Sequence, residues 1–325
     1  MPGPRSRRVM FIGLAMSAVL IGLFAVRLDW KEFRSAIAGV SWPWVVAACF
    51  AICASITLRA ARWAAIGAGN SVFPKYWSAT VVGYLGNVLY PGRAGELLRV
   101  AALHKAAALP PGQILATAVL DRMSDVIALG FIALYVMVAS AAIIASNTAV
   151  TTVILLILAP AAGFVVVLAL GGRFKPWLVR FSARLPAPWA ERIPRWYLQG
   201  LQACSALFSL NRLVPVTVLT VTAYCVDWVF FMCLLRAFEW SLPLIAAMTV
   251  GVLLAIGSLV PAAPGYVGIY QVACVIALAP YGVRESAALA YSLVAQGATV
   301  LVITTLGLAI AARYGMRYIS VKDGG

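Results

Sequence analysis

Charged residues are scarce in this sequence, and acidic ones are the scarcest. Asp, Glu, Lys and Arg together make up only 11% of the 325 residues, while 63% are hydrophobic. Because an ordinary soluble domain is about 25% charged, this composition excludes that class. Several apolar runs reach the roughly 20 residues that cross a bilayer, and they are continuous rather than alternating, which argues against a transmembrane barrel. We therefore expect an all-α, polytopic membrane bundle.

Histidine and paired cysteine are also lacking. His104 is the single histidine, which excludes a catalytic triad or a histidine-based metal site within this chain. The six cysteines are scattered, mostly within apolar runs, and their spacing fits neither a metal site nor a disulfide framework. We interpret them as small packing residues, and we expect no metal and no cofactor.

The basic residues, which give a net charge of +15, lie between hydrophobic segments rather than in a recognition helix or tail. This is the positive-inside pattern of a membrane protein, not a nucleic-acid-binding pattern. It predicts about eight crossings with both termini inside, provided that 266–280 traverses the bilayer. We also expect a retained first helix over 9–26, an outer interfacial segment at 27–41 and a cytoplasmic amphipathic connection at 172–212. All of these belong to a single predicted domain, 1–325.

One apolar run breaks abruptly within residues 83–99. Pro91 removes a backbone donor and Gly92 frees the backbone dihedrals, so a helix cannot continue unstrained. In hydrocarbon such a break is tolerated only where protein or a water-filled cavity satisfies the loose backbone groups. Arg93, Glu96 and Arg99 follow within seven residues. We expect a re-entrant hairpin that can grip a charged headgroup.

A second break lies at residues 261–271, after another apolar run. Tyr270 and Gln271 follow it, and they either bind polar headgroup atoms or cap the broken helix. The segments 91–95 and 264–268 share the pattern PGxxG. Interrupted helices at matching places in two halves are typical of transporter binding sites. The shared pattern therefore indicates an internal repeat, although so short a motif also arises by coincidence.

The long helix expected over 113–139 carries Asp121, Arg122 and Asp125 in its first half. Ionisable residues within a membrane usually face a cavity or a partner. With Arg93, Glu96 and Arg99 they form a set of zero net charge. Such a set either is a self-neutralising network or lets arginines bind a phosphate while the acids orient them.

Asp227 is an isolated acid in the span expected over 213–235. Two interpretations stay open for an acid at such a depth. It either couples transport to protons or pairs with an arginine of another helix.

Three blocks of this sequence resemble the lysylphosphatidylglycerol synthase transmembrane-region family, also described as flippase-like integral membrane proteins. The blocks are Asn87…Pro91-Gly-Arg-Ala-Gly-Glu96…Arg99, Asp121-Arg122-Met-Ser-Asp125 and Pro264-Gly-Tyr-Val-Gly-Ile-Tyr-Gln271. Their order and spacing cover about residues 40–312. The resemblance implies a helical membrane domain with broken or re-entrant segments that binds and translocates a lipid. No soluble aminoacyl-transfer domain follows, so lysyl transfer is not expected.

The leading hypothesis is a lipid translocase of a bacterial-type inner membrane, which moves a phosphate-bearing phospholipid or a polyprenyl- or hopanoid-type lipid. It is a transporter rather than an enzyme, with an anionic lipid headgroup as its partner. The alternatives are a membrane-embedded glycosyl or phosphoryl transferase and a non-catalytic partner of a lipid-modifying enzyme, and an oligomer is possible. The expected headgroup contacts are Arg93, Arg99, Asn87, Tyr270 and Gln271. The orienting residues are Glu96, Asp121, Arg122 and Asp125, and the helix-breaking residues are Pro91, Gly92, Gly95, Pro264, Gly265 and Gly268.

Overall fold

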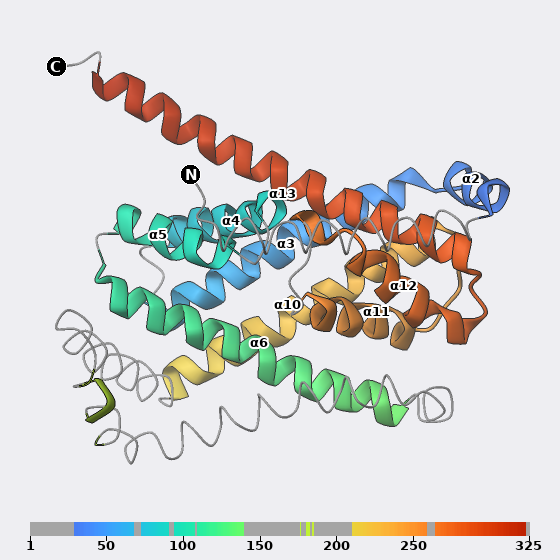
Figure 1. Ribbon diagram of the computed structural model, residues 1–325, viewed down its shortest axis with the longest axis horizontal. Coiled ribbons are helices and arrows are strands. Elements are labelled where there is room, and N and C mark those ends of the chain that lie inside the picture. The colour runs from blue at the N-terminus through green and yellow to red at the C-terminus, as the bar shows by residue number, and fades with distance from the viewer. Residues whose placement is uncertain are drawn as a thin grey trace. The chain divides into compact units, whose positions relative to one another are not determined.

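The computed structural model (Figure 1) is helical in all its regular elements within the residues that it describes, which confirms the expected all-α class. The described residues are 29–67, 73–90, 94–107, 109–139, 176, 180–182, 184, 210–258 and 264–322. The side chains of 210, 264 and 314–322 are not included. The predicted first helix at 9–26 and most of the predicted 172–212 connection lie outside the described residues.

Nine α-helices and two short 3₁₀ turns make up the elements labelled within these ranges. The helices are α2 (Trp30–Ala38), α3 (Trp42–Gly67), α4 (Phe73–Leu89), α5 (Gly95–Ala107), α6 (Pro111–Ala139), α10 (Leu210–Ala237), α11 (Leu244–Gly257), α12 (Ile269–Leu278) and α13 (Glu285–Lys322). The turns are η2 (Pro264–Tyr266) and η3 (Ala279–Tyr281).

Four of these helices are long and apolar enough to cross a membrane. They contain the segments Trp42–Gly67, Pro111–Ala139, Asn211–Ala237 and Glu285–Arg313. Helices α11 and α12 have only 14 and 10 residues, about 21 and 15 Å at 1.5 Å per residue. The hydrocarbon core is about 30 Å thick, so neither crosses alone. The full crossing assumed at 266–280 would therefore need more than α12.

Helix α3 differs from the sequence expectation at its end. The apolar pattern predicts a span that stops at Leu58, with Arg59 and Arg62 as a basic flank. The helix instead continues to Gly67. Alanine and arginine are good helix formers, so nothing in this stretch ends the helix, and both arginines are held on it as helical residues.

The chain divides into two compact units by its internal contacts. Unit 1 comprises Met1–Ile56, Ser78–Arg99 and Cys225–Gly325, and unit 2 comprises Thr57–Trp77 and Val100–Tyr224. Helices α3, α4, α5 and α10 each contribute residues to both units.

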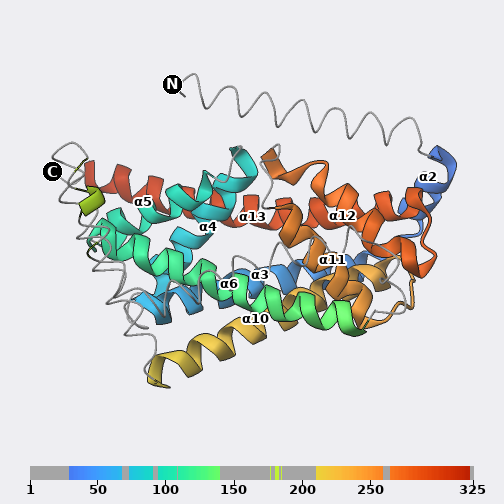
Figure 2. The ribbon, with the colours of Figure 1, turned by 60° about the horizontal axis from the view of Figure 1, so that its bottom comes forward.

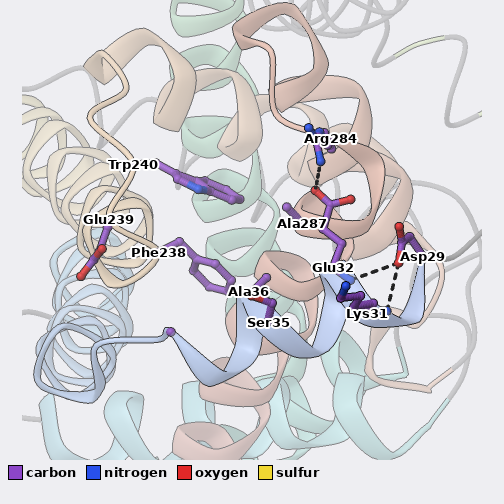
Figure 3. A pocket seen from close by; sticks show the side chains of 11 residues that line it. Asp29, Lys31, Glu32, Ser35, Ala36, Phe238, Glu239, Trp240, Arg284 and Ala287 are labelled. Carbon is purple, nitrogen blue, oxygen red and sulfur yellow. Dashed lines mark hydrogen bonds and ion pairs between the residues drawn. The ribbon is translucent and has the colours of Figure 1, made fainter.

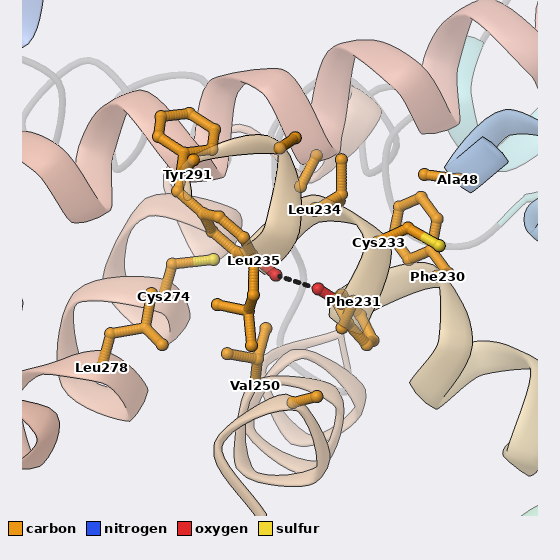
Figure 4. Packing of buried hydrophobic residues seen from close by; sticks show 14 of the residues in the cluster. Ala48, Phe230, Phe231, Cys233, Leu234, Leu235, Val250, Cys274, Leu278 and Tyr291 are labelled. Atoms are coloured by element: carbon orange, nitrogen blue, oxygen red, sulfur yellow. Dashed lines mark hydrogen bonds between the residues drawn. The ribbon is translucent and has the colours of Figure 1, made fainter. Parts of the chain in front are cut away.

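The core of unit 1 lies between the end of α10 and the helices α11, α12 and α13. Helices α11 and α12 lie side by side, and α13 packs on α12 and on α2 (Figures 1 and 2). Figure 4 shows Leu234, Val250, Cys274 and Tyr291 packed together; the Tyr291 hydroxyl donates to the carbonyl of Phe231 at 3.2 Å. Much of the remaining core is alanine, and small side chains let membrane helices approach closely.

Unit 2 is built around the buried Trp63. Its ring meets Tyr76 edge-on at 5.0 Å, and its Nε1–H donates to Thr117 Oγ1 at 3.2 Å. Both ends of this amphipathic side chain therefore have partners. The contacts fix the second half of α3 against α6 within this unit.

Candidate functional site

The first break separates α4, which ends at Leu89, from α5, which begins at Gly95. The N–H of Gly95 donates to Asn87 Oδ1 at 3.0 Å. The first amides of a helix lack intrahelical partners, so Asn87 supplies one of them from across the break. Pro91, Gly92 and Arg93 lie outside the described residues, and their roles stay predictions.

Glycines bring α4 and α5 into backbone contact on either side of this break. A Cβ built on Gly86 would lie 2.8 Å from the Cα of Gly95, and one built on Gly83 would lie 2.8 Å from the Cβ of Arg99. A Cβ on Gly95 would collide with the carbonyl oxygen of Gly83. The glycine pair at 83 and 86 is the signal in the sequence that could have predicted this contact, since small residues allow such close approach.

Arg99 is buried at the start of α5. Its side chain is 3% exposed, and its Nε lies 2.9 Å from Glu96 Oε2, one turn earlier. Glu96 is thus paired with Arg99, and its orienting role at a headgroup site stays a prediction. A buried guanidinium is distinct from a solvated basic flank, because burying an ionised group costs free energy unless it is paired.

Left-handed backbone and a chain of amides define the second break. Gly265 and Gly268 have φ of 72° and 91°, which glycine adopts freely. The N–H of Gly268 donates to Gln271 Oε1 at 2.7 Å, and Gln271 Nε2 donates to Gln296 Oε1 at 2.9 Å. Gln296 Nε2 then donates to the carbonyl of Gly265 at 2.7 Å. Two side-chain amides thus satisfy the loose donor and acceptor of the break.

The capping interpretation of Gln271 is therefore confirmed, and its role as a headgroup contact stays a prediction. The Tyr270 hydroxyl donates a hydrogen bond to Thr299 Oγ1 at 3.3 Å. Gln296 and Thr299 both belong to α13, and nothing in the local sequence of the break identifies either of them. Only the packing of α12 on α13 brings them to the break.

Replacing Gln296 with leucine should lower the free energy of unfolding by about 2–6 kcal/mol. The change leaves the Gly265 carbonyl and the Gln271 amide without their partner, and each buried orphan costs about 1–3 kcal/mol. Reversible unfolding in mixed detergent micelles measures the loss. Leu301→Ala, at an exposed position of the same helix, is the control and should change stability by less than about 1 kcal/mol.

Helix α13 contacts both interrupted segments of unit 1. Gln296 and Thr299 hold the second break. A Cβ on Gly307 would lie 2.6 Å from the side chain of Leu85, which is on α4 shortly before the first break. Gly307 follows Gln296 by eleven residues, about 17 Å along the helix. One continuous helix thus positions both breaks.

Asp227 lies within α10, in a segment long enough to span. Ser55 Oγ, on α3, donates to Asp227 Oδ1 at 2.5 Å. The two residues join helices of unit 1 in the middle of candidate spans, where polar partners are favoured over lipid exposure. A coupling role for Asp227 stays a prediction.

Unit 2 contains a cluster of three arginines and two aspartates. Arg62 is 0% exposed and donates from Nε to Asp121 Oδ1 at 2.9 Å and from Nη1 to Asp125 Oδ1 at 2.7 Å. Arg59 Nη1 reaches the same Asp125 oxygen at 2.7 Å, and Arg122 Nη1 lies 3.2 Å from Asp125 Oδ2. Asp121 and Asp125 thus share one face of α6, as their spacing predicts.

Aromatic and backbone groups complete this cluster. The guanidinium of Arg59 lies 5.0 Å from the centre of the Tyr224 ring, within range of a cation–π interaction. The Tyr224 hydroxyl donates to the Asp125 carbonyl at 3.1 Å. These contacts tie α3, α6 and the first half of α10 together within unit 2.

Arg59 and Arg62 are members of this cluster that we did not predict from the sequence. The predicted charge set joined Asp121 and Asp125 to Arg93, Arg99 and Arg122, whereas the partners described within unit 2 are Arg59, Arg62 and Arg122. The available signal was spacing. Arg59 and Arg62 are three residues apart and Asp121 and Asp125 are four apart, so each pair shares a helix face. The two positive charges of the first pair equal the two negative charges of the second.

Among the residues that the structure describes, no group of three or more His, Cys, Asp and Glu is arranged to hold a metal ion.

The comparisons with known proteins identify the family. The family model described as "Lysylphosphatidylglycerol synthase TM region" matches residues 10–307. Neither the curated proteins nor the solved structures returned a match. Because that family model covers most of the chain, the protein belongs to the lysylphosphatidylglycerol synthase transmembrane-region family.

Proposed function

We propose that the protein translocates a phosphate-bearing lipid between the leaflets of a membrane. The observation that carries this proposal is the pair of helix breaks along α13, each closed by a side-chain amide. Asn87 serves the first break and Gln271 the second. Interrupted helices within a membrane are tolerated where they line a cavity, and they form the substrate sites of many transporters.

In this proposal the headgroup passes the breaks while the hydrocarbon chains stay in lipid. Arg99, oriented by Glu96, and Arg93 provide the phosphate contacts, since a guanidinium fork matches phosphate oxygens. The amide side chains have a second use here. Because Asn87 and Gln271 satisfy the breaks from within the protein, they can exchange those bonds for a headgroup without a large net cost.

The arginine–aspartate cluster of unit 2 also supports this proposal, because its acids are held in place by ion pairs. Asp121 and Asp125 are engaged by arginines, which suits an orienting role better than that of a general base in a transferase. We place Arg122 in this orienting group as well.

A vesicle assay tests the proposal. The purified chain is reconstituted into phosphatidylcholine vesicles that contain fluorescently labelled phosphatidylglycerol, and dithionite destroys the label in the outer leaflet. Transport exposes the inner-leaflet label as well. Arg93→Ala should abolish this exposure. Asn87→Ala loses one hydrogen bond and should slow it about tenfold, whereas Gln271→Ala loses two and should slow it further.

Gly297→Ala is the matched control on α13, because a Cβ there meets nothing within 4 Å. Its rate should equal that of the unmodified protein. Unchanged transport by Arg93→Ala would remove that residue from the site. Chemical modification of the lipid would instead support the transferase, and neither activity would support the non-catalytic partner of a lipid-modifying enzyme.

A further inference from the structure

A cavity of about 520 Å³ lies in unit 1, away from both helix breaks in the sequence. It is lined by α2, by the residues that follow α10 and by the start of α13 (Figure 3). This volume falls within the range of small-molecule sites, about 300–1,000 Å³. Neither the family assignment nor the proposed transport gives this cavity a role.

The cavity has an aromatic wall and a charged wall. Figure 3 shows the Trp240 ring on one side and the Glu32–Arg284 pair across from it. Trp240 is fixed in place because it stacks on Tyr291 at 5.8 Å and 24° and meets Phe238 at 5.1 Å. An ordered indole face is the preferred surface for a cationic group.

The charged wall is loosely closed. Arg284 Nη1 lies 3.5 Å from Glu32 Oε1, whereas a charge-assisted hydrogen bond measures about 2.7–2.9 Å. The Arg284 side chain is 81% exposed and that of Glu32 only 25%. This ion pair can therefore open at little cost, which would leave a carboxylate across the cavity from the indole and an exposed guanidinium next to it.

The local charge is opposite in sign to that of the whole chain. Three carboxylates line the cavity against two cations, Lys31 and Arg284, although the chain carries a net charge of +15. Asp29 caps α2 by accepting from the N–H groups of Lys31 and Glu32. Figure 3 shows the Glu239 carboxylate turned away from Trp240. Glu32 is thus the acid that faces the indole.

The cavity lies at the ends of candidate membrane spans. Candidate spans begin at Trp42, end at Ala237 and begin again at Glu285, and the lining residues lie at or just beyond these ends. Trp30, Trp42 and Trp44 are exposed nearby in the sequence, as in the aromatic belt of a membrane interface. Lipid headgroups occupy this layer.

We propose that this cavity binds a zwitterionic headgroup in which an ammonium stands beside a phosphate, as in phosphoethanolamine. The ammonium would lie between the Trp240 face and Glu32, and the phosphate would meet Arg284. A headgroup without the ammonium would leave Glu32 facing an anion and would bind more weakly. The inference does not depend on the proposed transport, because a binding site here needs no movement of lipid.

Calorimetry on the full chain in detergent tests this proposal with two soluble probes. Glycerophosphoethanolamine and glycerophosphoglycerol share the phosphate, and only the first carries an ammonium. We expect the first to bind about tenfold more tightly, the size of a partly desolvated cation–π contact. Glu32→Gln and Trp240→Leu should each reduce the preference to about threefold or less.

Two further variants keep the test decisive. Glu285→Gln removes the same charge from a residue that does not line the cavity, and it should preserve the preference. Arg284→Gln, at a largely exposed position, should weaken both probes about equally. Equal binding of the two probes, binding of neither, or an equal loss in Glu285→Gln would overturn the proposal.

A second arm identifies the source of the headgroup. Native mass spectrometry of the chain in nanodiscs with equal phosphatidylethanolamine and phosphatidylglycerol measures which lipid is retained. Retention of phosphatidylethanolamine that is lost in Trp240→Leu supports a lipid ligand. A preference seen only with the soluble probes supports the same chemistry with a free solute as the source.

Discussion

Replacing Arg62 with leucine is expected to lower the free energy of unfolding by about 3–5 kcal/mol, the cost of breaking a buried ion pair from one side. The Arg62 side chain is fully buried and contacts both Asp121 and Asp125. Leucine fills much of the volume but removes the nearer cation from Asp121, itself 2% exposed, so that Arg122 Nη2, at 3.7 Å, remains as a more distant arginine contact. Reversible unfolding in mixed detergent micelles measures the change.

The double variant Arg62→Leu with Asp121→Leu is the decisive companion. Replacing both members of a buried pair by apolar residues is often neutral, so the double variant should recover most of the loss. Arg122→Ala is the milder control, since that side chain is 33% exposed and exposed pairs contribute about 0–1 kcal/mol. A double variant as unstable as the single one would mean that Arg62 acts through packing rather than charge.

Replacing Gly95 with alanine should separate α4 from α5 and destroy transport. The added Cβ collides with the Gly83 carbonyl and lies 2.5 Å from Asn87 Oδ1. Backbone cannot move aside as a flexible side chain does, so the helix start must shift and the Asn87 bond is lost. We expect a destabilisation of about 3 kcal/mol, the upper part of the range for overpacking, and no label exposure in the vesicle assay.

Gly297→Ala separates this steric effect from the general effect of alanine for glycine. Nothing lies within 4 Å of a Cβ at that position of α13. Alanine within a helix is favoured over glycine by about 0.5–1 kcal/mol, so this variant should be slightly more stable and fully active. Normal transport by Gly95→Ala would show that the close approach of α4 and α5 is not required.

The helical class followed from composition, because apolar runs of this length have few other solutions in a bilayer. The pairing of the aspartates of α6 with particular arginines did not follow from composition. Sequence places Asp121 and Asp125 on one helix face, but it does not say which arginines reach them. Arg59 and Arg62 stand after an apolar run that resembles a complete span, and proximity in the sequence to a helix end suggested a solvated flank instead.

At the second break, too, the sequence predicts one part of the structure and only the packing of helices decides the rest. Its location was visible from proline and glycine, which act locally on the backbone. Its closure was not visible, because Gln296 lies 25 residues after Gln271 and donates to the Gly265 carbonyl from another helix.

The sequence by itself determined that this is a helical membrane protein interrupted at two places, because hydrophobicity and backbone restriction are properties of single residues and their neighbours. Only the tertiary structure decided which polar groups satisfy those interruptions, which arginines neutralise the acids of α6 and where a lined cavity forms. These depend on helices that meet in space, and the positions of such meetings are set by side-chain packing over the whole unit rather than by any one segment.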